Sequence, residues 1–177
     1  LGLVVVDIAD AANPTLAGSL AIPMEVYGLV VEGAYAYVTG YSGTDYRLSV
    51  VDISTPSAPA IVGGVDLPHD VSGRSPTASG GHVYVPDYEG VQVIDVAVPT
   101  LPQIVAEFDT RGQAYDVAVA ENGLASVGTA FYGVQVFDVS DPENPAPLSR
   151  IVNTGGGGHD VAMSGDHLVS LGSHTLQ

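Results

Sequence analysis

At Leu3-Val4-Val5-Val6-Asp7-Ile8 the chain carries a hexapeptide that returns three more times in closely similar form. The other copies are Leu48-Ser49-Val50-Val51-Asp52-Ile53, Val91-Gln92-Val93-Ile94-Asp95-Val96 and Val134-Gln135-Val136-Phe137-Asp138-Val139. Their aspartates are 45, 43 and 43 residues apart. A fixed period of this size indicates an array of supersecondary units, each of which must stack on its neighbours to bury its apolar faces.

The same order of segments follows each hexapeptide. A turn with proline comes first, because proline lacks the amide hydrogen that a central strand needs. An outer strand, a short inner strand, a tight turn and a further strand come next. Outer strands are expected at 60–67 and 103–109, inner strands at 28–31, 70–72, 116–119 and 160–163, and further strands at 34–39, 82–85, 124–128 and 168–172. This pattern predicts an all-β fold, a β-propeller of four-stranded antiparallel blades that forms one domain over residues 1–177.

The hexapeptides resemble the LVIVD repeat, which defines a bacterial and archaeal propeller family found mostly in exported proteins. The resemblance covers essentially the whole chain, with blade repeats starting near residues 3, 48, 91 and 134. The single segment Ala36-Tyr37-Val38-Thr39-Gly40 also resembles the motif of YVTN-type surface-layer propellers. The resemblance implies a propeller of typically more than four blades, used for binding or assembly, and it brings no catalytic residues with it.

The two ends of the chain have complementary patterns. Residues 1–8 begin at a hexapeptide strand, whereas the last repeat runs through 168–172 without a hexapeptide of its own. We therefore expect residues 1–8 to complete the blade that ends at 177, or a neighbouring chain's blade, because propellers remove open strand edges in this way. Four arrangements stay open: one chain closed as four blades, two copies forming eight, a larger propeller, or head-to-tail assembly into a ring or filament.

The charge balance is strongly acidic. Twenty acidic residues face four arginines and no lysine, which gives a formal charge of −16. Such a surface repels phosphate backbones and anionic lipid, so nucleic acid is not an expected partner. Divalent-cation binding and life in high salt are two explanations, but a solvated acidic surface that keeps a secreted protein soluble is favoured.

Apolar segments, a signal peptide and cysteines are the sequence features that bear on where the protein is located. No segment approaches the roughly 20 apolar residues that cross a bilayer, so membrane insertion is not expected. The chain starts at Leu1 without a basic stretch and apolar run, so a signal peptide is expected to be absent or already removed. The lack of cysteine excludes disulfides and thiolate metal sites. Together with the resemblance, these features predict an extracellular or cell-surface protein.

The recurring aspartates of the hexapeptides are predicted to have a structural role. Each ends an apolar strand just before a proline turn, where an aspartate side chain accepts backbone hydrogen bonds and sets the turn. This interpretation is favoured over a ring of carboxylate ligands. The four residues are Asp7, Asp52, Asp95 and Asp138.

A ligand site is predicted at the entry to the inner strands. One register there carries Tyr27, His69, Tyr115 and His159, which are expected at one end of the central channel. Imidazole is a common metal ligand, so His69 and His159 are metal candidates, with calcium or another divalent cation as a possible cofactor. The neighbouring Asp70 and Asp160 should point to the opposite side of the strand and not share the ion.

Other candidate residues are assigned plainer roles. His82, His167 and His174 are expected to be solvated or locally bonded. Gly155 to Gly158 is expected to be a flexible loop, since no lysine or helix follows to bind phosphate. The aromatic residues of the links are expected to pack between blades rather than to stack on sugars. They are Tyr41, Tyr46, Tyr88, Phe131 and Tyr132.

The sequence shows no catalytic motif. It has no cysteine nucleophile and no Gly-x-Ser-x-Gly turn. The resulting hypothesis is a non-catalytic binding or structural scaffold whose partner is another protein or further copies of itself. The alternative is a propeller hydrolase or lactonase with a central divalent cation.

Overall fold

The computed structural model describes residues 2–151, 158–165 and 167–172, and the described part is all-β. Three sheets have four antiparallel strands each. They are β3 (Glu25–Glu32), β4 (Tyr35–Tyr41), β5 (Tyr46–Asp52) and β6 (Ala60–Leu67); β7 (Thr77–Ser79), β8 (His82–Pro86), β9 (Gly90–Asp95) and β10 (Gln103–Asp109); and β11 (Ala114–Val119), β12 (Leu124–Thr129), β13 (Gly133–Asp138) and β14 (Ala146–Ile151). Two further sheets have two strands each, β1 (Gly2–Asp7) with β2 (Thr15–Ala21), and β15 (Gly158–Ser164) with β16 (His167–Gly172).

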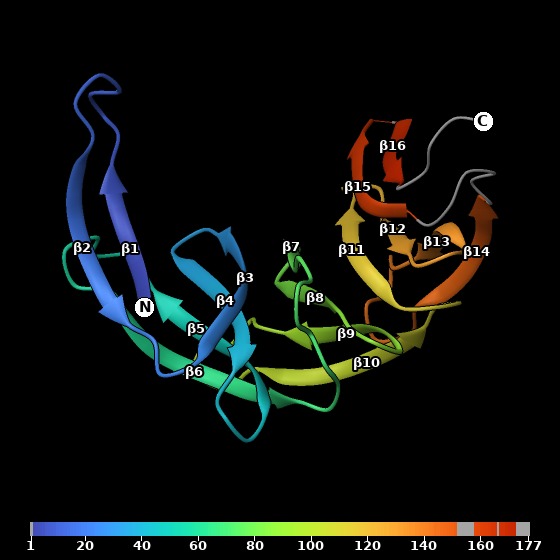
Figure 1. Cartoon of the computed structure of the whole chain (residues 1–177), viewed down its shortest axis with the longest axis horizontal. Coiled ribbons are helices and arrows are strands. Elements are labelled where there is room, and N and C mark those ends of the chain that lie inside the picture. The colour runs from blue at the N-terminus through green and yellow to red at the C-terminus, as the bar shows by residue number, and fades with distance from the viewer. Residues whose placement is uncertain (1, 152–157, 166, 173–177) are drawn as a thin grey trace.

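The five sheets follow one another along an open arc (Figure 1). The β1–β2 hairpin lies at one tip of the arc and the β15–β16 hairpin at the other. In each complete sheet the strands lie in chain order, and the first strand contacts the first strands of its neighbours, as β7 does with β3 and β11. The predicted all-β architecture of four-stranded antiparallel sheets is confirmed for the three complete sheets.

Among the described residues, the two terminal hairpins do not pair with each other. In the described part, β1 pairs with β2 and β16 pairs with β15, in separate sheets. The expectation that residues 1–8 complete the blade that ends at 177, or a neighbouring chain's blade, stays a prediction. In Figure 1 the successive sheets turn through only part of a circle, and the two terminal hairpins lie apart.

In the three complete sheets the hexapeptide forms the third strand, whereas the first copy forms β1, and all four of these strands end at the aspartate. In β5, β9 and β13 the apolar side chains are mostly buried, as expected for strands covered on both faces. The copy in β1 differs, because Val4 is 62% exposed and Val6 is 47% exposed. The expectation that each unit buries its apolar faces by stacking on its neighbours does not hold for β1, whose sheet packs against the β3–β6 sheet on one side only in the described part.

The core lies between the sheets rather than within any one of them. One cluster joins Val91 and Val93 of β9 to Val117 and Val127 of the next sheet. A second cluster joins the β3–β6 sheet to the β7–β10 sheet, and a third joins the β1–β2 sheet to β4 and β5. Each sheet is therefore stabilised by its neighbours, as in other repeat proteins.

The same close backbone contact occurs at two of the interfaces between adjacent sheets. A Cβ on Gly18 would lie 2.2 Å from the carbonyl oxygen of Pro56, and one on Gly63 would lie 2.1 Å from that of Pro99. In both cases an outer strand presses a glycine against the proline turn of the next sheet. A side chain there would collide with backbone, so glycine allows the close approach.

The inner strand that was predicted at residues 70–72 does not form. Residues 70–72 form a turn, and the inner strand of that sheet is the short β7. The Asp70 Oδ1 atom accepts the Ser72 amide at 2.7 Å, and Gly73 has a φ of +69°. A side-chain hydrogen bond two residues on and a left-handed glycine both favour a turn over a strand.

Within the described residues, no helix has the length and apolar character needed to span a membrane.

Candidate functional site

One end of the complete sheets gathers the links from outer strands to the next inner strands together with the turns between second and third strands. We call this surface the loop end; it comprises residues 42–45, 68–76, 87–89, 110–113 and 130–132. Backbone hydrogen bonds connect its pieces. The Thr110 amide donates to the Glu89 carbonyl at 3.2 Å, and the Ala130 amide donates to the Gln113 carbonyl at 2.9 Å. The loop end is therefore a continuous, supported surface.

Three of the four predicted ligand residues share one structural position. Tyr27, Tyr115 and His159 lie where the inner strands β3, β11 and β15 change register against their partners. Such β-bulges redirect side chains and are common beside binding sites. The side chain of His159 lies outside the described part of the structure.

His69 does not share this position. It lies in the link before the inner strand, and Arg74 occupies the corresponding place instead. Ser75 forms a parallel bridge with Asp116, directly after Tyr115, and the Arg74 carbonyl lies 2.8 Å from a Cβ built on Gly28. The turn at residues 70–73 therefore shifts the register by several residues, which the sequence pattern did not reveal.

Arg74 is a buried cation at the loop end, with 5% of its surface exposed. Its Nε donates to the Ala114 carbonyl at 2.9 Å, and its Nη1 donates to the Ser72 carbonyl at 2.5 Å. The guanidinium carbon lies 5.2 Å from the ring centre of Tyr88 and 5.6 Å from that of Tyr115. These cation–π contacts and hydrogen bonds tie the link to the β11–β14 sheet.

Two carboxylates near Arg74 have shifted pKa values. Burial acts to raise the pKa of Asp70, but hydrogen bonds from the side chain and amide of Ser72 outweigh it and lower the pKa. Burial raises the pKa of Asp116, whose Oδ2 accepts the Val161 amide at 2.8 Å. Asp116 thus joins β11 to the terminal β15–β16 hairpin.

His69 meets two glutamates on the neighbouring sheet. Its Nε2 atom lies 3.2 Å from the Oε1 atom of Glu107 on β10. Glu89, from the β8–β9 turn, brings a carboxylate oxygen to the same place, and the three potential ligand atoms lie within 4.8 Å of one another. Neither glutamate was singled out in the sequence, because only the sheet pairing brings them together.

The other histidines are not part of this group. The Nδ1 atom of His82 lies 3.2 Å from the Gly80 carbonyl oxygen, which is a local contact. His167 is exposed at the start of β16. His174 and Gly155 to Gly157 lie outside the described residues, and Gly158 begins β15.

The four recurring aspartates have the same local geometry. In each, the Oδ1 atom accepts the backbone amide two residues on, at 2.8–2.9 Å. Among the described residues they do not join a group of metal-ligand size. Hydrogen bonds from the side chain and amide of Ser140 lower the pKa of Asp138, and those from Ser54 lower the pKa of Asp52.

The aromatic side chains of the turns divide into two groups. Tyr41 and Tyr46 pack together with ring centres 5.1 Å apart. Phe131 is 87% exposed with a φ of +66°, and Tyr88 and Tyr132 are 54% and 45% exposed. The expectation of packing between blades is wrong for Phe131, whereas Tyr88 lies beside Arg74 and Tyr132 lies beside Gly112 with about half of each side chain exposed.

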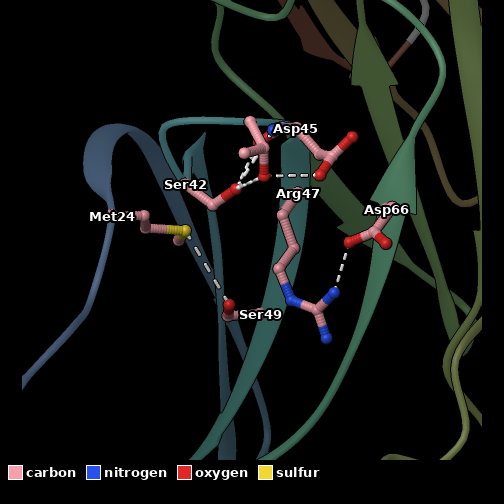
Figure 2. A network of polar contacts seen from close by, with 7 residues as sticks. Met24, Ser42, Asp45, Arg47, Ser49 and Asp66 are labelled. Atoms are coloured by element: carbon pink, nitrogen blue, oxygen red, sulfur yellow. Dashed lines mark hydrogen bonds and ion pairs between the residues drawn. The ribbon is translucent and has the colours of Figure 1, made fainter.

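The loop end of the β3–β6 sheet carries a local polar network, shown in Figure 2. Arg47 on β5 pairs with Asp66 on β6. The Ser42 hydroxyl donates to the Asp45 carbonyl at 3.0 Å across the β4–β5 turn. The network joins adjacent strands and fixes the turn.

The family follows from comparison of the sequence with known families. The LVIVD repeat matches residues 1–21, 25–67 and 74–110. The chain belongs to the LVIVD repeat family. LVIVD repeats form β-propellers, in agreement with the stacked antiparallel sheets. None of the curated proteins compared matches this LVIVD chain.

Two solved structures share the fold at low sequence identity. A functionally unknown protein from Desulfotomaculum acetoxidans DSM 771 has a TM-score of 0.81 and 12% identity, over 97% of this LVIVD chain and 56% of that chain. The computationally designed Ika8 protein has a TM-score of 0.66 and 16% identity, over 89% of this chain and 46% of that one. The LVIVD chain thus spans about half the length of these structures.

Proposed function

We propose that this LVIVD chain is a non-catalytic scaffold, outside the cell or at its surface, that associates through its two half-blades with a second copy of itself. The observation that carries the proposal is their complementarity. The β1–β2 hairpin corresponds to the third and fourth strands of a complete sheet, and β15–β16 corresponds to the first and second. Together, β15, β16, β1 and β2 have the strand content of one blade.

Each half-blade has the surface features of an unfinished sheet. β1 and β16 each pair on one side only in the described part, and a free edge offers backbone groups to another strand. Apolar side chains accompany the edges, with Val4 at 62%, Val169 at 60% and Leu171 at 65% exposure. A hollow of about 200 Å³ between β1 and the β3–β4 hairpin is lined by Val26 and Leu29 among others.

A second copy of the chain is the partner that fits the open edges of β1 and β16. Head-to-tail association would place β16 of one copy beside β1 of the next, with the apolar faces covered. The two solved structures are longer than this chain, which supports a ring with more blades than one copy supplies. The acidic composition supports a role away from nucleic acid and in a secreted setting.

Light scattering after size exclusion, over a range of protein concentrations, tests the proposal. We expect a mass of two or more copies for the unmodified chain and a shift toward one copy in Leu171→Lys, which places a charge on the exposed face of β16. Leu101→Lys is the matched control, because Leu101 is 64% exposed but lies in the turn between β9 and β10.

A single-copy mass at every concentration would refute self-association. Loss of association in both variants would also count against the proposal, since a general charge effect would explain it. Circular dichroism confirms that both variants keep their strands.

A further inference from the structure

The group of His69, Glu89 and Glu107 lies at the loop end and is independent of the half-blades. Its members come from the β6–β7 link, the β8–β9 turn and strand β10. All three potential ligand atoms lie within 4.8 Å of one another. Zn²⁺ bonds nitrogen and carboxylate oxygen at about 2.0–2.2 Å, so small side-chain rotations would bring the three atoms around one ion.

Two of the three positions are held by the surrounding structure. The Glu89 amide donates to the Oδ1 atom of Asp87 at 2.8 Å, and the Glu89 carbonyl accepts the Thr110 amide at 3.2 Å. Glu107 lies inside β10, opposite Gln92 of β9. The side chains of Glu89 and Glu107 are exposed, so the ion would have to order them, but their backbone positions already direct both carboxylates toward His69.

The charges around His69, Glu89 and Glu107 also favour the binding of a cation. Two carboxylates approach each other and one imidazole, whose charge depends on protonation. The nearby guanidinium of Arg74 is engaged by the Ala114 and Ser72 carbonyls and by two tyrosine rings. A divalent ion between the carboxylates would relieve their repulsion and use the neutral imidazole as a ligand.

The ligand types select the class of ion. Calcium and magnesium prefer oxygen ligands alone, whereas imidazole with carboxylates suits zinc and similar transition metals. Three protein ligands leave a coordination position for water. The group lies on a link, a turn and the outer strand β10, so it differs from the site of Tyr27, His69, Tyr115 and His159 that was predicted at one end of a central channel.

We propose that His69, Glu89 and Glu107 form a site for one zinc-class divalent cation. The ion would fasten the link after β6 to the β7–β10 sheet. This site does not depend on how the half-blades are completed.

Calorimetric titration of the tag-free, metal-stripped chain with Zn²⁺ tests the proposal. We expect one equivalent to bind, and binding to weaken at least about tenfold in His69→Ala and in Glu107→Gln. His82→Ala is the matched control for the histidine, and Glu121→Gln, an exposed glutamate of the β11–β12 turn, is the control for the carboxylate. Both controls should bind as the unmodified chain does.

Two further measurements sharpen the test. Co²⁺ should give visible absorption bands of a low-coordinate nitrogen–oxygen site, and His69→Ala should lose them. Ca²⁺ should bind more weakly than Zn²⁺. Absence of zinc binding, unchanged affinity in His69→Ala, or an equal loss in His82→Ala would overturn the proposal. Glu107→Gln is nearly isosteric, so it keeps the test valid if His69→Ala is poorly folded.

Discussion

Strands β9 and β1 carry the same hexapeptide in two different surroundings. In β9, Val91, Val93 and Ile94 are fully buried, whereas in β1 the exposed fractions of Val4 and Val6 are 62% and 47%. The motif is almost the same, so the difference comes from the neighbours. β9 lies in a sheet between two complete sheets, while β1 lies at the tip of the arc. Burial is thus a property of the stack and not of the repeat.

The largest expected effect separates these two strands directly. Ile94→Ala should lower the free energy of unfolding by about 2–5 kcal/mol, because it removes buried methyl groups and leaves a cavity. Ile8→Ala is the matched change, since Ile8 follows β1 and is 71% exposed. It should cost no more than about 0.5 kcal/mol.

Urea titration followed by circular dichroism measures both changes. Equal losses would mean that another copy of the chain, or another blade, already covers the β1 end under the conditions used. Repeating the titration at low protein concentration would then separate the two strands.

An intermediate effect is expected for a buried and an exposed arginine. Arg74→Met should cost about 1–3 kcal/mol, because two carbonyls at the loop end lose their donor. Arg47→Met should cost about 0.2–1 kcal/mol, since Arg47 pairs with Asp66 on the surface. Denaturation in urea tests both variants, and a larger loss from Arg47→Met would show that the Arg74 contacts do not hold the sheets together.

The smallest effect on stability is expected at Asp116, which connects β11 to the terminal β15–β16 hairpin. The folded-state pKa of Asp116 is raised by burial, so the folded chain holds this proton more tightly than the unfolded chain does. The contribution of Asp116 to stability is therefore greatest below its ordinary pKa and is lost as pH rises through the folded-state pKa. Asp116→Asn removes this dependence and keeps an oxygen for the Val161 amide.

The stability difference between the two proteins gives the readout. As the pH rises from acid to neutral, the free energy of unfolding of Asp116→Asn should increase relative to that of the unmodified chain. The change should be smaller than the losses expected for Ile94→Ala and Arg74→Met. A difference that stays constant with pH would show that Asp116 is ordinarily solvated.

Much of the fold could be predicted from the sequence because its signals are local. Alternating and continuous apolar residues, proline turns and a constant period identify the strands and their order. The outer strands at 60–67 and 103–109 have the predicted bounds. These features depend on residues near one another in the chain.

The candidate site and the arrangement of the sheets depend on pairing between segments that are distant in the sequence. The turn at 70–73 moves His69 out of the register of Tyr27 and Tyr115, and the turn residues themselves do not show how far the register shifts. Glu89 and Glu107 meet His69 only after the sheet has formed. The angle between successive sheets is a property of packing that the repeat pattern does not encode.

The glycine contacts at Pro56 and Pro99 have a consequence for how such chains change in length. The first two contacts between sheets share one feature, because each places a glycine of the outer strand against a proline turn of the next sheet. A duplicated unit of one period would keep this backbone contact on either side. Gene duplication would therefore add or remove a whole blade while the backbone contact between successive sheets is preserved.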